Sequence, residues 1–590
     1  MSIAELRASS PSIIMIGSHP GVIQSMLDYD FMIGRAEPSV IAVIVQGRKL
    51  ERYFWGTDEV IIPAVPMLSD LKKELADKCT VAVNVQSARR VLSSTKEAVA
   101  KLPNLKLISI FAEQTPETHS LELRTLAIKK NVLIVGPSSV GVLLPGTMKI
   151  GAIGGTQYPQ LVEAKIAKAG KVAVISTSGG MVNELIHIAT GSGQGVSFAI
   201  ALGGDRFPVT DPMTAMLLAQ NDELTERIIY FGELGGTDEY EIARLIDEGK
   251  LTKPIIAYVA GVVAELFDTP PQFGHAKALA QTDDESATAK KDRLRKSGVI
   301  VCDHLGEIAD KLDNGDTTMS KEQNVPGIGE RKKRAIISHI SGDKDGEVQL
   351  LGHELLETIE RNSIASLVLS LLLGKQVESK RAIDFTDLVL RMLVDHGPYV
   401  SGAVNTIITA RAGRDLVSGL TAGLLTIGPR FGGAINEASR GWVDGATSGV
   451  SAKEFVDSYV KQGGIIAGIG HKKYRIDMPD PRVEALMQFS GNSNGDRYLK
   501  FARSVEEITT TKKGNLILNI DGAIGAVMLD ILESELGYKP DELRELADIE
   551  FFNALFVLSR SIGFTAHYLD QRRNDEGLFR LDTDDVRYIA

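Results

Sequence analysis

Two α/β domains followed by an all-α domain are the architecture that the sequence predicts, and three observations indicate it. The chain has 590 residues, and a single hydrophobic core stops growing at roughly 250 to 300 residues. Short β-branched runs alternate with amphipathic stretches through the first half of the chain. Long segments with helical periodicity and few strand signals fill the second half. Several domains of different classes are therefore expected.

The first predicted domain, residues 1–150, is Rossmann-like. Strands alternating with helices form a parallel, doubly wound sheet. Its expected helices are VIQSMLDYD and SARRVLSSTKEAVAKL, and its expected strands are SIIMIG, VIAVIV, TVAVNV, LKLISIF and NVLIVG. After a Gly-rich link the alternation resumes over residues 151–312, where we expect a flavodoxin-like domain. The strands expected there are KVAVIS, VSFAIAL, RIIYFGEL, KPIIAYVAG and SGVIVC.

The rest of the chain changes character twice. Residues 313–345 are polar and charged, which is the composition of a linker. Beyond them, residues 346–590 carry long periodic segments, beginning with VQLLGHELLETIERNSIASLVLSLLLG. This half is predicted to be nearly all helical.

Composition narrows the possible classes of protein. A content of 44% hydrophobic and 24% charged residues is that of an ordinary globular protein. Cys79 and Cys302 are too few for a disulfide framework or a zinc site, which fits inert core residues in a reducing compartment. The N-terminus has no signal-peptide pattern, and no apolar run reaches the ~18 residues of a membrane span. A cytoplasmic protein with no membrane partner is expected, and the net charge of -11 argues against a nucleic-acid partner.

Two glycine turns in the second α/β domain share one design. KVAVIS leads into Thr177-Ser178-Gly179-Gly180, and IIYFGEL leads into Gly235-Gly236-Thr237. Each turn puts free backbone N-H groups and a helix N-terminus at the carboxyl edge of the sheet, an arrangement that binds phosphate. For either turn alone, a simple chain reversal that needs glycine is an equally good interpretation.

His275, in the string Gln272-Phe273-Gly274-His275-Ala276, is expected near the same edge. Helix dipoles that hold phosphate would also stabilise a phosphorylated imidazole, which makes His275 a candidate phosphoryl acceptor. Glu233 could accept a hydrogen bond from the other ring nitrogen and fix the tautomer. Without the two turns, a lone loop histidine would be interpreted as an ordinary surface residue.

The strings STSGGMVNE, FGELGGTDEYEIARLIDEGKLTKPI and QFGHAKALA resemble the α subunit of the succinyl-CoA synthetase family, and more closely the ATP-citrate lyase family. The resemblance implies that His275 is a phosphohistidine and that Mg²⁺ binds near Glu233. It also implies a phosphate pocket made of Ser178, Gly179, Gly180, Glu233, Gly235 and Gly236. The first domain begins IIMIGSHPGVIQ, where the synthetases show G-x-T-G-x-x-G. The resemblance therefore does not assign a CoA phosphate to Gly17, Ser18 and Gly21.

In the helical half, four short strings place an ionisable residue beside glycine or inside an apolar run. Burying such groups is costly unless they are paired or used, so their recurrence indicates a site. Taken alone, Asp521 would be interpreted as an N-cap carboxylate. The four strings are Asp395-His396-Gly397-Pro398, Gly468-Ile469-Gly470-His471, Asn519-Ile520-Asp521-Gly522 and Ser559-Arg560-Ser561.

DHGPYVSGAVNT, GIGHKKYRIDMPDPR, LNIDGAIG, LSRSIG and GLFR together resemble citrate synthase. The resemblance implies that His396 and His471 contact the oxaloacetate or citryl group and that Asp521 is a general acid/base. It also implies carboxylate binding by Arg482, Arg560 and Arg580, in keeping with the bidentate geometry of guanidinium groups. Lys472, Lys473, Lys512 and Lys513 could hold CoA phosphates, although a merely solvated face is an equally good interpretation.

One substitution separates the chain from citrate synthase. The string Gly428-Pro429-Arg430-Phe431-Gly432 carries Phe431 where citrate synthase has a catalytic histidine. The citrate-synthase-like module of ATP-citrate lyases, which works in the cleaving direction, shares that substitution. The helical half is therefore expected to be a citrate synthase-like citryl-CoA lyase domain.

The resemblance to ATP-citrate lyase covers nearly the whole chain. It implies that acetyl-CoA and oxaloacetate form from citrate, CoA and ATP through phosphohistidine and citryl-CoA. The sequence has no recognisable ATP-grasp region and no G-x-x-x-x-G-K-[ST] loop, so a separate ATP-grasp β-like subunit is expected to bind ATP, Mg²⁺ and citrate. A homotetrameric core within a hetero-oligomer is expected, in which Arg580 could serve a neighbouring subunit.

Several alternatives stay open at this level. Either His471 or Asp521 could take the citryl hydroxyl proton. The chain could also be a citryl-CoA synthetase subunit without lyase activity. Finally, its helical half could be a non-catalytic module for oligomerisation and CoA sensing.

Overall fold

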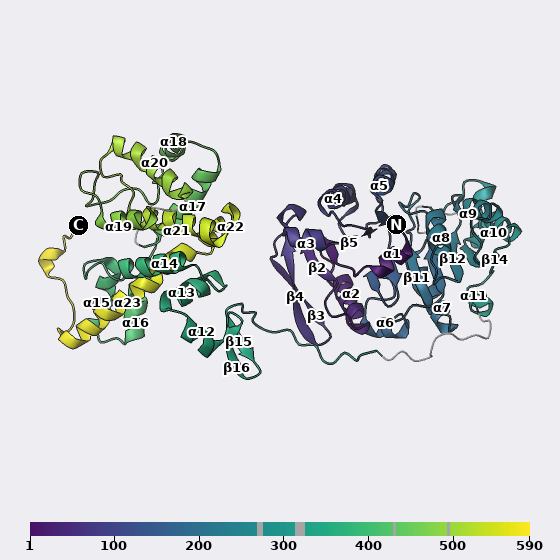
Figure 1. The fold of residues 1–590 in the computed structure, drawn as a ribbon, viewed down its shortest axis with the longest axis horizontal. Coiled ribbons are helices and arrows are strands. Elements are labelled where there is room, and N and C mark those ends of the chain that lie inside the picture. The colour runs from purple at the N-terminus through teal and green to yellow at the C-terminus, as the bar shows by residue number, and fades with distance from the viewer. Residues whose placement is uncertain (268–274, 276, 313–324, 429–431, 492–495, 590) are drawn as a thin grey trace. The chain divides into compact units, whose positions relative to one another are not determined.

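The computed structural model describes residues 1–267, 275, 277–312, 325–428, 432–491 and 496–589 (Figure 1). The chain divides into two compact units, Met1–Ala335 and Ile336–Ala590. The first unit contains two α/β sheets and the second is mainly helical, so the predicted fold class is confirmed. No helix in the described part of the chain is long and apolar enough to cross a bilayer.

The first sheet has seven strands in the order β3-β4-β2-β1-β5-β6-β7. Neighbouring strands are parallel except for the antiparallel hairpin β3–β4, which turns at Gly56 (φ 60°). All five strands predicted for this domain form, and the hairpin adds two that were not predicted. The strands are β1 (Ile13–Ile16), β2 (Val40–Ile44), β3 (Leu50–Trp55), β4 (Asp58–Val65), β5 (Val81–Asn84), β6 (Leu107–Ile110) and β7 (Leu133–Val135).

Five α-helices and one 3-10 helix flank this sheet. α4 and α5 pack against each other beside it, as Figure 1 shows. Cys79 is fully buried, as predicted for a core residue, and burial raises the pKa of its thiol. The helices are α1 (Ile3–Ala8), α2 (Pro20–Met32), η1 (Leu68–Asp70), α3 (Lys73–Lys78), α4 (Ala88–Lys101) and α5 (Glu117–Lys130).

The second sheet has seven strands in the order β14-β13-β12-β10-β11-β8-β9. The five predicted strands, β10 to β14, pair in parallel, whereas β8 and β9 add an antiparallel edge. The strands are β8 (Gly141–Leu144), β9 (Met148–Gly151), β10 (Val172–Ser176), β11 (Val196–Ala201), β12 (Arg227–Glu233), β13 (Ile255–Ala260) and β14 (Ile300–Val301). The helices are α6 (Tyr158–Glu163), α7 (Gly179–Gly191), α8 (Pro212–Gln220), α9 (Asp238–Asp247), η2 (Val262–Leu266), η3 (Asp283–Glu285), α10 (Ala287–Lys296) and α11 (Gly306–Leu312).

The position of β10 in the second sheet prepares a binding site. β10 and β11 are buried along their whole length, which is usual for strands covered on both faces. β10 pairs with β11 on one side and with β12 on the other, so the strand order reverses there. Ligands of open α/β sheets collect beyond the carboxyl ends of the strands at such a switch point.

Part of the predicted linker is held on the first unit. Residues 313–324 lie outside the described residues. In the segment after them, the Arg331 guanidinium donates to the Gly56 carbonyl at 2.8 Å and pairs with the buried carboxylate of Asp28. The side chain of Arg331 also lies over the Phe54 ring, 5.4 Å from its centroid. The last stretch of the first unit is therefore bound to α2 and the β3–β4 hairpin.

The second unit opens with a small antiparallel sheet, β15 (Ser341–Lys344), β16 (Glu347–Leu350) and β17 (His353–Glu354). The predicted helix over VQLLGHE is wrong here. Asp345 and Gly346 both have positive φ and close a tight turn, which pairs the flanking residues as strands. Val348 and Leu350 are two residues apart, which is the side-chain period of a strand.

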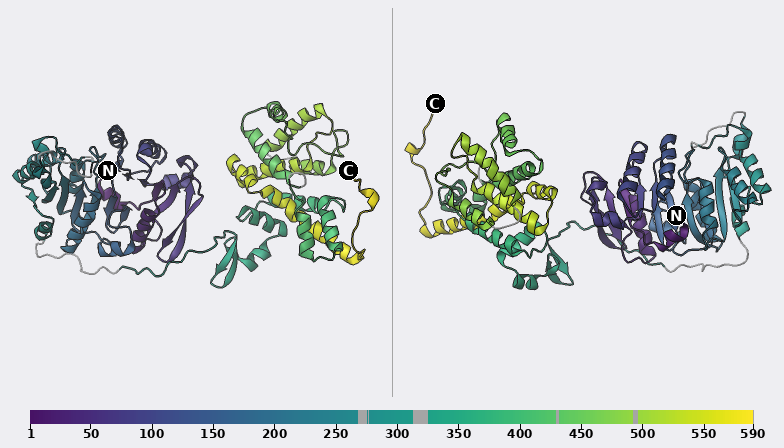
Figure 2. Two further views of the ribbon diagram at one scale, coloured as in Figure 1. Left: turned by 180° about the vertical axis from the view of Figure 1, so that it is seen from behind. Right: turned by 45° about the horizontal axis from the view of Figure 1, so that its top comes forward.

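The remainder of the second unit is helical, as predicted. The long helix α21 runs through the core, and α14, α17, α19 and α20 pack around it. α15, α16 and α23 form a second group, and the tail after α23 leaves the helices (Figure 2). The helices are α12 (Leu355–Arg361), α13 (Ile364–Leu373), α14 (Lys380–Leu393), α15 (Ser401–Arg411), α16 (Leu416–Leu424), α17 (Ala434–Thr447), α18 (Ala452–Lys461), α19 (Pro481–Ser490), α20 (Arg497–Lys512), α21 (Ile520–Leu536), α22 (Pro540–Asp548), α23 (Phe551–Asn574) and η4 (Thr583–Asp585).

Candidate functional sites

The β10–α7 turn lies at the switch point of the second sheet. Ser178 is the N-cap of α7, and its hydroxyl accepts a hydrogen bond from the Met181 amide at 3.5 Å. A Cβ at Gly179 would lie 2.7 Å from Val140, whereas Gly180 faces open space. The helix starts at Gly179, so both glycines belong to its first turn. Their N-H groups are among those that a helix leaves without intrahelical partners.

The β12–α9 turn lies beside the first one, because β12 pairs with β10. Gly235 and Gly236 have φ angles of 85° and 67°, a conformation that favours glycine. A Cβ at Gly235 would also lie 1.9 Å from the carbonyl oxygen of Lys277, so the chain that carries Lys277 packs directly on this turn. The two predicted phosphate-binding turns are therefore neighbours at one sheet edge.

His275 lies against this edge and contacts Glu233 at the end of β12. Its Nδ1 is 2.8 Å from Oε2 of Glu233, the pairing that the sequence predicts. This hydrogen bond raises the pKa of His275 despite partial burial, and the charges of Glu113 and Asp205 act in the same direction. A Cβ at Gly204 would lie 2.4 Å from the imidazole ring, so glycine is needed behind it. With Nδ1 engaged, Nε2 is the nitrogen left for chemistry.

Glu233 offers one oxygen to a cation. Oε1 of this buried carboxylate has no hydrogen-bond partner among the described residues. The same residues contain no group of three histidine, cysteine or acidic side chains that could hold a metal. Mg²⁺ usually binds proteins through one or two carboxylates and takes its other ligands from phosphates and water. The residues present fit Mg²⁺ held jointly with a phosphate ligand.

The β1–α2 turn of the first sheet is built differently. His19 caps α2 with its own ring, whose Nδ1 accepts from the Val22 amide at 3.3 Å. Gly17 has a φ of 92°, and Gly21 faces open space. One of the helix N-H groups that a CoA phosphate would use is therefore already taken by His19. CoA binding by Gly17, Ser18 and Gly21 stays unassigned.

In the second unit, Asp521 lies in the first turn of α21. Asn519, not Asp521, is the N-cap, and it accepts from the Gly522 amide at 3.1 Å. The interpretation of Asp521 as an N-cap carboxylate is therefore wrong. Burial raises the pKa of Asp521 to about 6, and the positive charges of Arg482 and Arg560 oppose this rise.

His471 reaches the same place from a loop that packs on α21. A Cβ at Gly468 would lie 2.7 Å from Cα of Gly522, so only glycine allows this approach. Nδ1 of His471 accepts from the amides of Lys473 at 3.0 Å and Tyr474 at 2.9 Å. Burial lowers the pKa of His471, which favours the neutral ring. Because Nδ1 is an acceptor, the proton of the neutral ring lies on Nε2, which becomes a donor.

Arg560 on α23 is a buried arginine of the second unit. Its residue is only 4% exposed, and Nε and Nη1 have no hydrogen-bond acceptor among the described residues. Burial lowers the pKa of its guanidinium, against the charges of Asp395 and Asp521. Buried charged groups are normally paired or bind a ligand. Two unpaired donors beside Asp521 thus form an incomplete anion site.

The other two predicted carboxylate-binding arginines are placed differently. Arg482 already binds Asp480 with two parallel contacts, Nε to Oδ1 at 3.0 Å and Nη2 to Oδ2 at 2.7 Å. Arg580 lies exposed in the tail after α23, and within the described residues it forms no ion pair. Its neighbour Phe579 packs under Arg411, 5.4 Å from the guanidinium.

His396 follows α14 and is held by its neighbour Asp395. That carboxylate accepts from the Gly397 amide at 2.9 Å and contacts Nε2 of His567 at 3.0 Å. Burial lowers the pKa of His396, and the charges of Arg482 and Arg560 add to the effect. The five predicted residues His396, His471, Arg482, Asp521 and Arg560 are therefore electrostatic neighbours. Phe431 lies outside the described residues.

Two of the predicted CoA lysines, Lys472 and Lys473, lie on one loop, and Lys512 and Lys513 lie where α20 ends and an adjacent loop begins. Backbone hydrogen bonds join the loops, from His471 to Asn515 at 2.9 Å and from Ile476 to Gly514 at 2.9 Å. All four lysines are exposed: Lys472, Lys473, Lys512 and Lys513. A pocket of about 510 Å³ opens beside the loops, and its wall includes Ile476. The position suits contacts with a phosphorylated ligand, although exposed lysines alone do not establish them.

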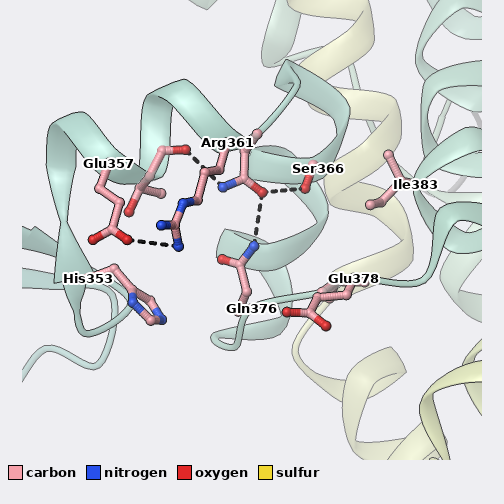
Figure 3. Close-up of a pocket in the computed structure, with 10 residues that line it drawn as sticks. His353, Glu357, Arg361, Ser366, Gln376, Glu378 and Ile383 are labelled. Atoms are coloured by element: carbon pink, nitrogen blue, oxygen red, sulfur yellow. Dashed lines mark hydrogen bonds and ion pairs between the residues drawn. The ribbon is translucent and has the colours of Figure 1, made fainter.

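Another pocket, of about 300 Å³, lies between α12, α13 and the start of α14. Some of its polar side chains pair with one another (Figure 3): Arg361 with Glu357 at 2.8 Å, and Gln376 with Asn362 at 2.9 Å. None of the predicted site residues lines it. The reactive groups of the second unit gather elsewhere, at the start of α21.

Two family models match the chain. A model for the citrate synthase C-terminal domain matches residues 335–582, and one for CoA-ligase matches residues 175–300. ATP-citrate synthase subunit 1 of Sordaria macrospora is 38% identical, over 97% of this chain and 88% of its own length. The chain belongs to the ATP-citrate synthase family. The resemblance predicted from the sequence is thereby confirmed.

Other members of the ATP-citrate synthase family differ in length. The beta chain protein 1 of Arabidopsis thaliana is 38% identical over 96% of both chains. The human ATP-citrate synthase is also 38% identical, over 98% of this chain, which spans 54% of its length. ATP citrate lyase from Methanothrix soehngenii, solved in complex with citrate and coenzyme A, is 34% identical. The likeness covers 98% of this chain and 97% of that one, with a TM-score of 0.53.

Proposed function

We propose that the chain is the subunit of an ATP-citrate lyase that carries both the phosphohistidine and the citryl-CoA lyase centre. Its substrates are citrate, CoA and ATP, and its products include acetyl-CoA and oxaloacetate. The observation that carries the proposal is the buried guanidinium of Arg560, which has two unpaired donors beside Asp521. Such an arrangement is costly unless a carboxylate ligand completes it.

In the first half reaction, His275 relays a phosphoryl group. Nε2 attacks the terminal phosphorus of ATP, and the bond from this phosphorus to the ADP oxygen breaks. The proton on Nδ1 stays there and remains hydrogen-bonded to Glu233. A citrate carboxylate then takes the phosphoryl group from Nε2, and the CoA thiolate displaces phosphate to give citryl-CoA. The N-H groups at the two glycine turns stabilise the phosphoryl charge throughout.

Mg²⁺ would be held by Glu233 together with nucleotide phosphate oxygens and would supply charge neutralisation there. ATP itself is assigned to a separate ATP-grasp subunit. The lengths of the relatives support a divided enzyme, because the human protein is a single longer chain and the Sordaria relative is called subunit 1. A homotetrameric core within a hetero-oligomer, with Arg580 reaching a neighbouring subunit, completes this assignment.

In the second half reaction, Asp521 takes the proton of the citryl hydroxyl. The carbon-carbon bond then breaks, oxaloacetate forms its ketone, and the electron pair passes into the enolate of acetyl-CoA. Asp521 returns its proton to the methylene carbon of the enolate. His471 is better suited to donate from Nε2–H than to act as the base, because two backbone amides occupy Nδ1.

The remaining residues bind and orient the citryl group. Arg560 holds one free carboxylate, and Arg482 holds the other when it exchanges Asp480 for the substrate. His396, kept neutral by a lowered pKa, hydrogen-bonds the oxygen that becomes the ketone. Lys472, Lys473, Lys512 and Lys513 contact the CoA phosphates. The raised pKa of Asp521 favours this lyase role over a purely structural helical half.

The test is the cleavage of synthetic citryl-CoA by the purified chain without ATP or any partner. The proposal expects acetyl-CoA and oxaloacetate in equal amounts, with the rate lost in Asp521→Asn. If the wild type does not cleave citryl-CoA, the chain is a citryl-CoA synthetase subunit without lyase activity. Cleavage that survives in Asp521→Asn would remove Asp521 from the chemistry.

A further inference from the structure

Lys277, two residues after His275, is buried beside the phosphate-binding turn. Its side chain is 5% exposed, and its ammonium pairs with the carboxylate of Asp238, the first residue of α9. A Cβ at Gly236 would lie 2.8 Å from Cε and 3.7 Å from Nζ of Lys277. The ammonium therefore lies at the turn, next to the N-terminus of α9.

The surroundings of this turn are acidic. Burial opposes the charge of Lys277, but Asp238, Glu239 and Glu233 more than compensate and raise the pKa of its ammonium. A phosphoryl dianion at the same turn would face these carboxylates as well. The helix dipole offsets only part of that repulsion, since it amounts to roughly half a unit charge. A cation that can move from a carboxylate to the phosphoryl group would offset the remaining repulsion.

Lys290, the other buried lysine at the turn, cannot fill that role. Its ammonium donates to the carbonyls of Glu233 at 2.8 Å and Gly235 at 2.6 Å, and it pairs with Glu239 at 2.7 Å. Its side chain is fully buried, and three partners use its three donors. Lys290 therefore fixes the shape of the turn.

Lys277 differs in the partner that holds it. The Asp238 side chain is 30% exposed, so its carboxylate can turn into solvent when Lys277 leaves it. The backbone of Lys277 is anchored independently, because its amide donates to the Gly204 carbonyl at 3.4 Å. Its side chain can thus change partner without moving the loop.

We propose that Lys277 binds the phosphoryl group carried by His275. Its ammonium then exchanges its ion pair with Asp238 for a contact with a phosphoryl oxygen. This inference rests on the proposed phosphohistidine. Lys277 stays protonated and transfers no proton: the bond from Nε2 to phosphorus forms, the bond from phosphorus to the leaving group breaks, and Lys277 neutralises the charge in between. Asp238 holds the ammonium in place until the phosphoryl group arrives.

Phosphoramidate provides a test that needs no partner subunit, because it transfers its phosphoryl group to histidine and releases ammonia. The full chain is compared as wild type, Lys277→Met, Lys277→Arg and Asp238→Asn, with label at His275 measured against time. Lys253→Met is the matched control. Lys253 also lies in this domain, and its ammonium donates to the Ala219 carbonyl at 2.9 Å. Thermal unfolding checks that the substituted domain of each variant is folded, and citryl-CoA cleavage, which uses the other unit, should stay at the wild-type rate.

A charge-assisted hydrogen bond of ordinary strength predicts that Lys277→Met lowers the labelling rate roughly tenfold or more. Lys277→Arg should restore most of the rate, and Asp238→Asn should label at least as fast as wild type because it frees the ammonium. Equal losses in Lys277→Met and Asp238→Asn would mean that the ion pair only holds the loop. A wild-type rate in Lys277→Met would also overturn the inference.

Binding of inorganic phosphate, followed by ³¹P NMR, separates this inference from the proposed function. If the wild type binds phosphate, Lys277→Met does not, and His275 is never labelled, then the phosphohistidine fails but Lys277 remains a phosphate ligand. If phosphate binding is the same in wild type and Lys277→Met, Lys277 has no such role.

Discussion

Replacement of Arg560 by methionine should weaken catalysis and strengthen the fold at the same time. Arg560 is 4% exposed, and two nitrogens of its guanidinium have no acceptor among the described residues. Each buried unpaired donor costs about 1 to 3 kcal/mol. The unliganded protein therefore carries a strain that a bound carboxylate relieves and that methionine removes. Methionine also keeps the packing on the Phe556 ring, whose centroid lies 4.8 Å from the guanidinium.

The loss of a buried, hydrogen-bonded charge pair with substrate costs about 2 to 5 kcal/mol. At 1.4 kcal/mol per factor of ten, kcat/KM for citryl-CoA cleavage should fall roughly 30- to 5,000-fold in Arg560→Met. The removal of two unpaired donors, together worth about 2 to 6 kcal/mol, should raise Tm of the helical unit by roughly 4 to 24 °C, at about 2 to 4 °C per kcal/mol. Oxaloacetate should stabilise the wild type but not the variant.

The assays are initial cleavage rates with synthetic citryl-CoA and thermal unfolding with and without oxaloacetate. Arg391→Met is the matched control: this arginine is 69% exposed and pairs with Asp387 at 2.8 Å, so both measurements should stay near wild type. A lower Tm in Arg560→Met would mean that the guanidinium has partners in the free protein. Unchanged cleavage would refute its role as a carboxylate ligand.

Three further predictions concern the remaining groups. Labelling of His275 should rise with pH through a midpoint above 6.5, because Glu233 raises the pKa of the imidazole and only the neutral ring attacks. Glu233→Gln should lower that midpoint. An unchanged midpoint in this variant would mean that Glu233 does not contact His275. Citryl-CoA cleavage should rise with pH through about 6 as Asp521 ionises, and a rate that falls over this range would mean that its protonated form acts first. The variant Lys512→Ala/Lys513→Ala should raise KM for citryl-CoA several-fold with little change in kcat and weaken the salt dependence of KM, whereas a pure kcat effect would contradict phosphate contacts.

The sequence predicted most of the fold because most helices and strands have a clear local sequence pattern. The ten predicted strands form in both sheets, and most of them are buried runs rich in β-branched residues, although Ile300 in β14 is exposed. The hairpin β3–β4 was missed although Gly56 marks its turn, because β3 mixes charged with aromatic residues and Pro63 interrupts the apolar run of β4. The helix predicted over β16 and β17 does not form, because the turn at Asp345–Gly346 pairs the flanking residues as strands.

The candidate sites were predicted mainly through resemblance to known families. The residues that contact the site residues were not predicted. Asp480 forms an ion pair with Arg482, and Asp395 accepts a hydrogen bond from the loop that carries His396. The sequence motifs contain both aspartates, but they did not predict these contacts. Nothing local marks Lys277 and Lys290 as buried, because lysine is ordinarily a surface residue. Their burial follows from the packing of residues 277–290 on the β12–α9 turn. Only the folded chain reveals such pairings.

The most direct test of a two-centre enzyme compares His275→Ala with Asp521→Asn in the complex with an ATP-grasp subunit. Both variants are supplied once with citrate, CoA and ATP and once with citryl-CoA. The account predicts that His275→Ala fails with citrate but cleaves citryl-CoA at the wild-type rate. It also predicts that Asp521→Asn consumes ATP and accumulates citryl-CoA. Loss of citryl-CoA cleavage in His275→Ala, or acetyl-CoA formation by Asp521→Asn, would contradict it.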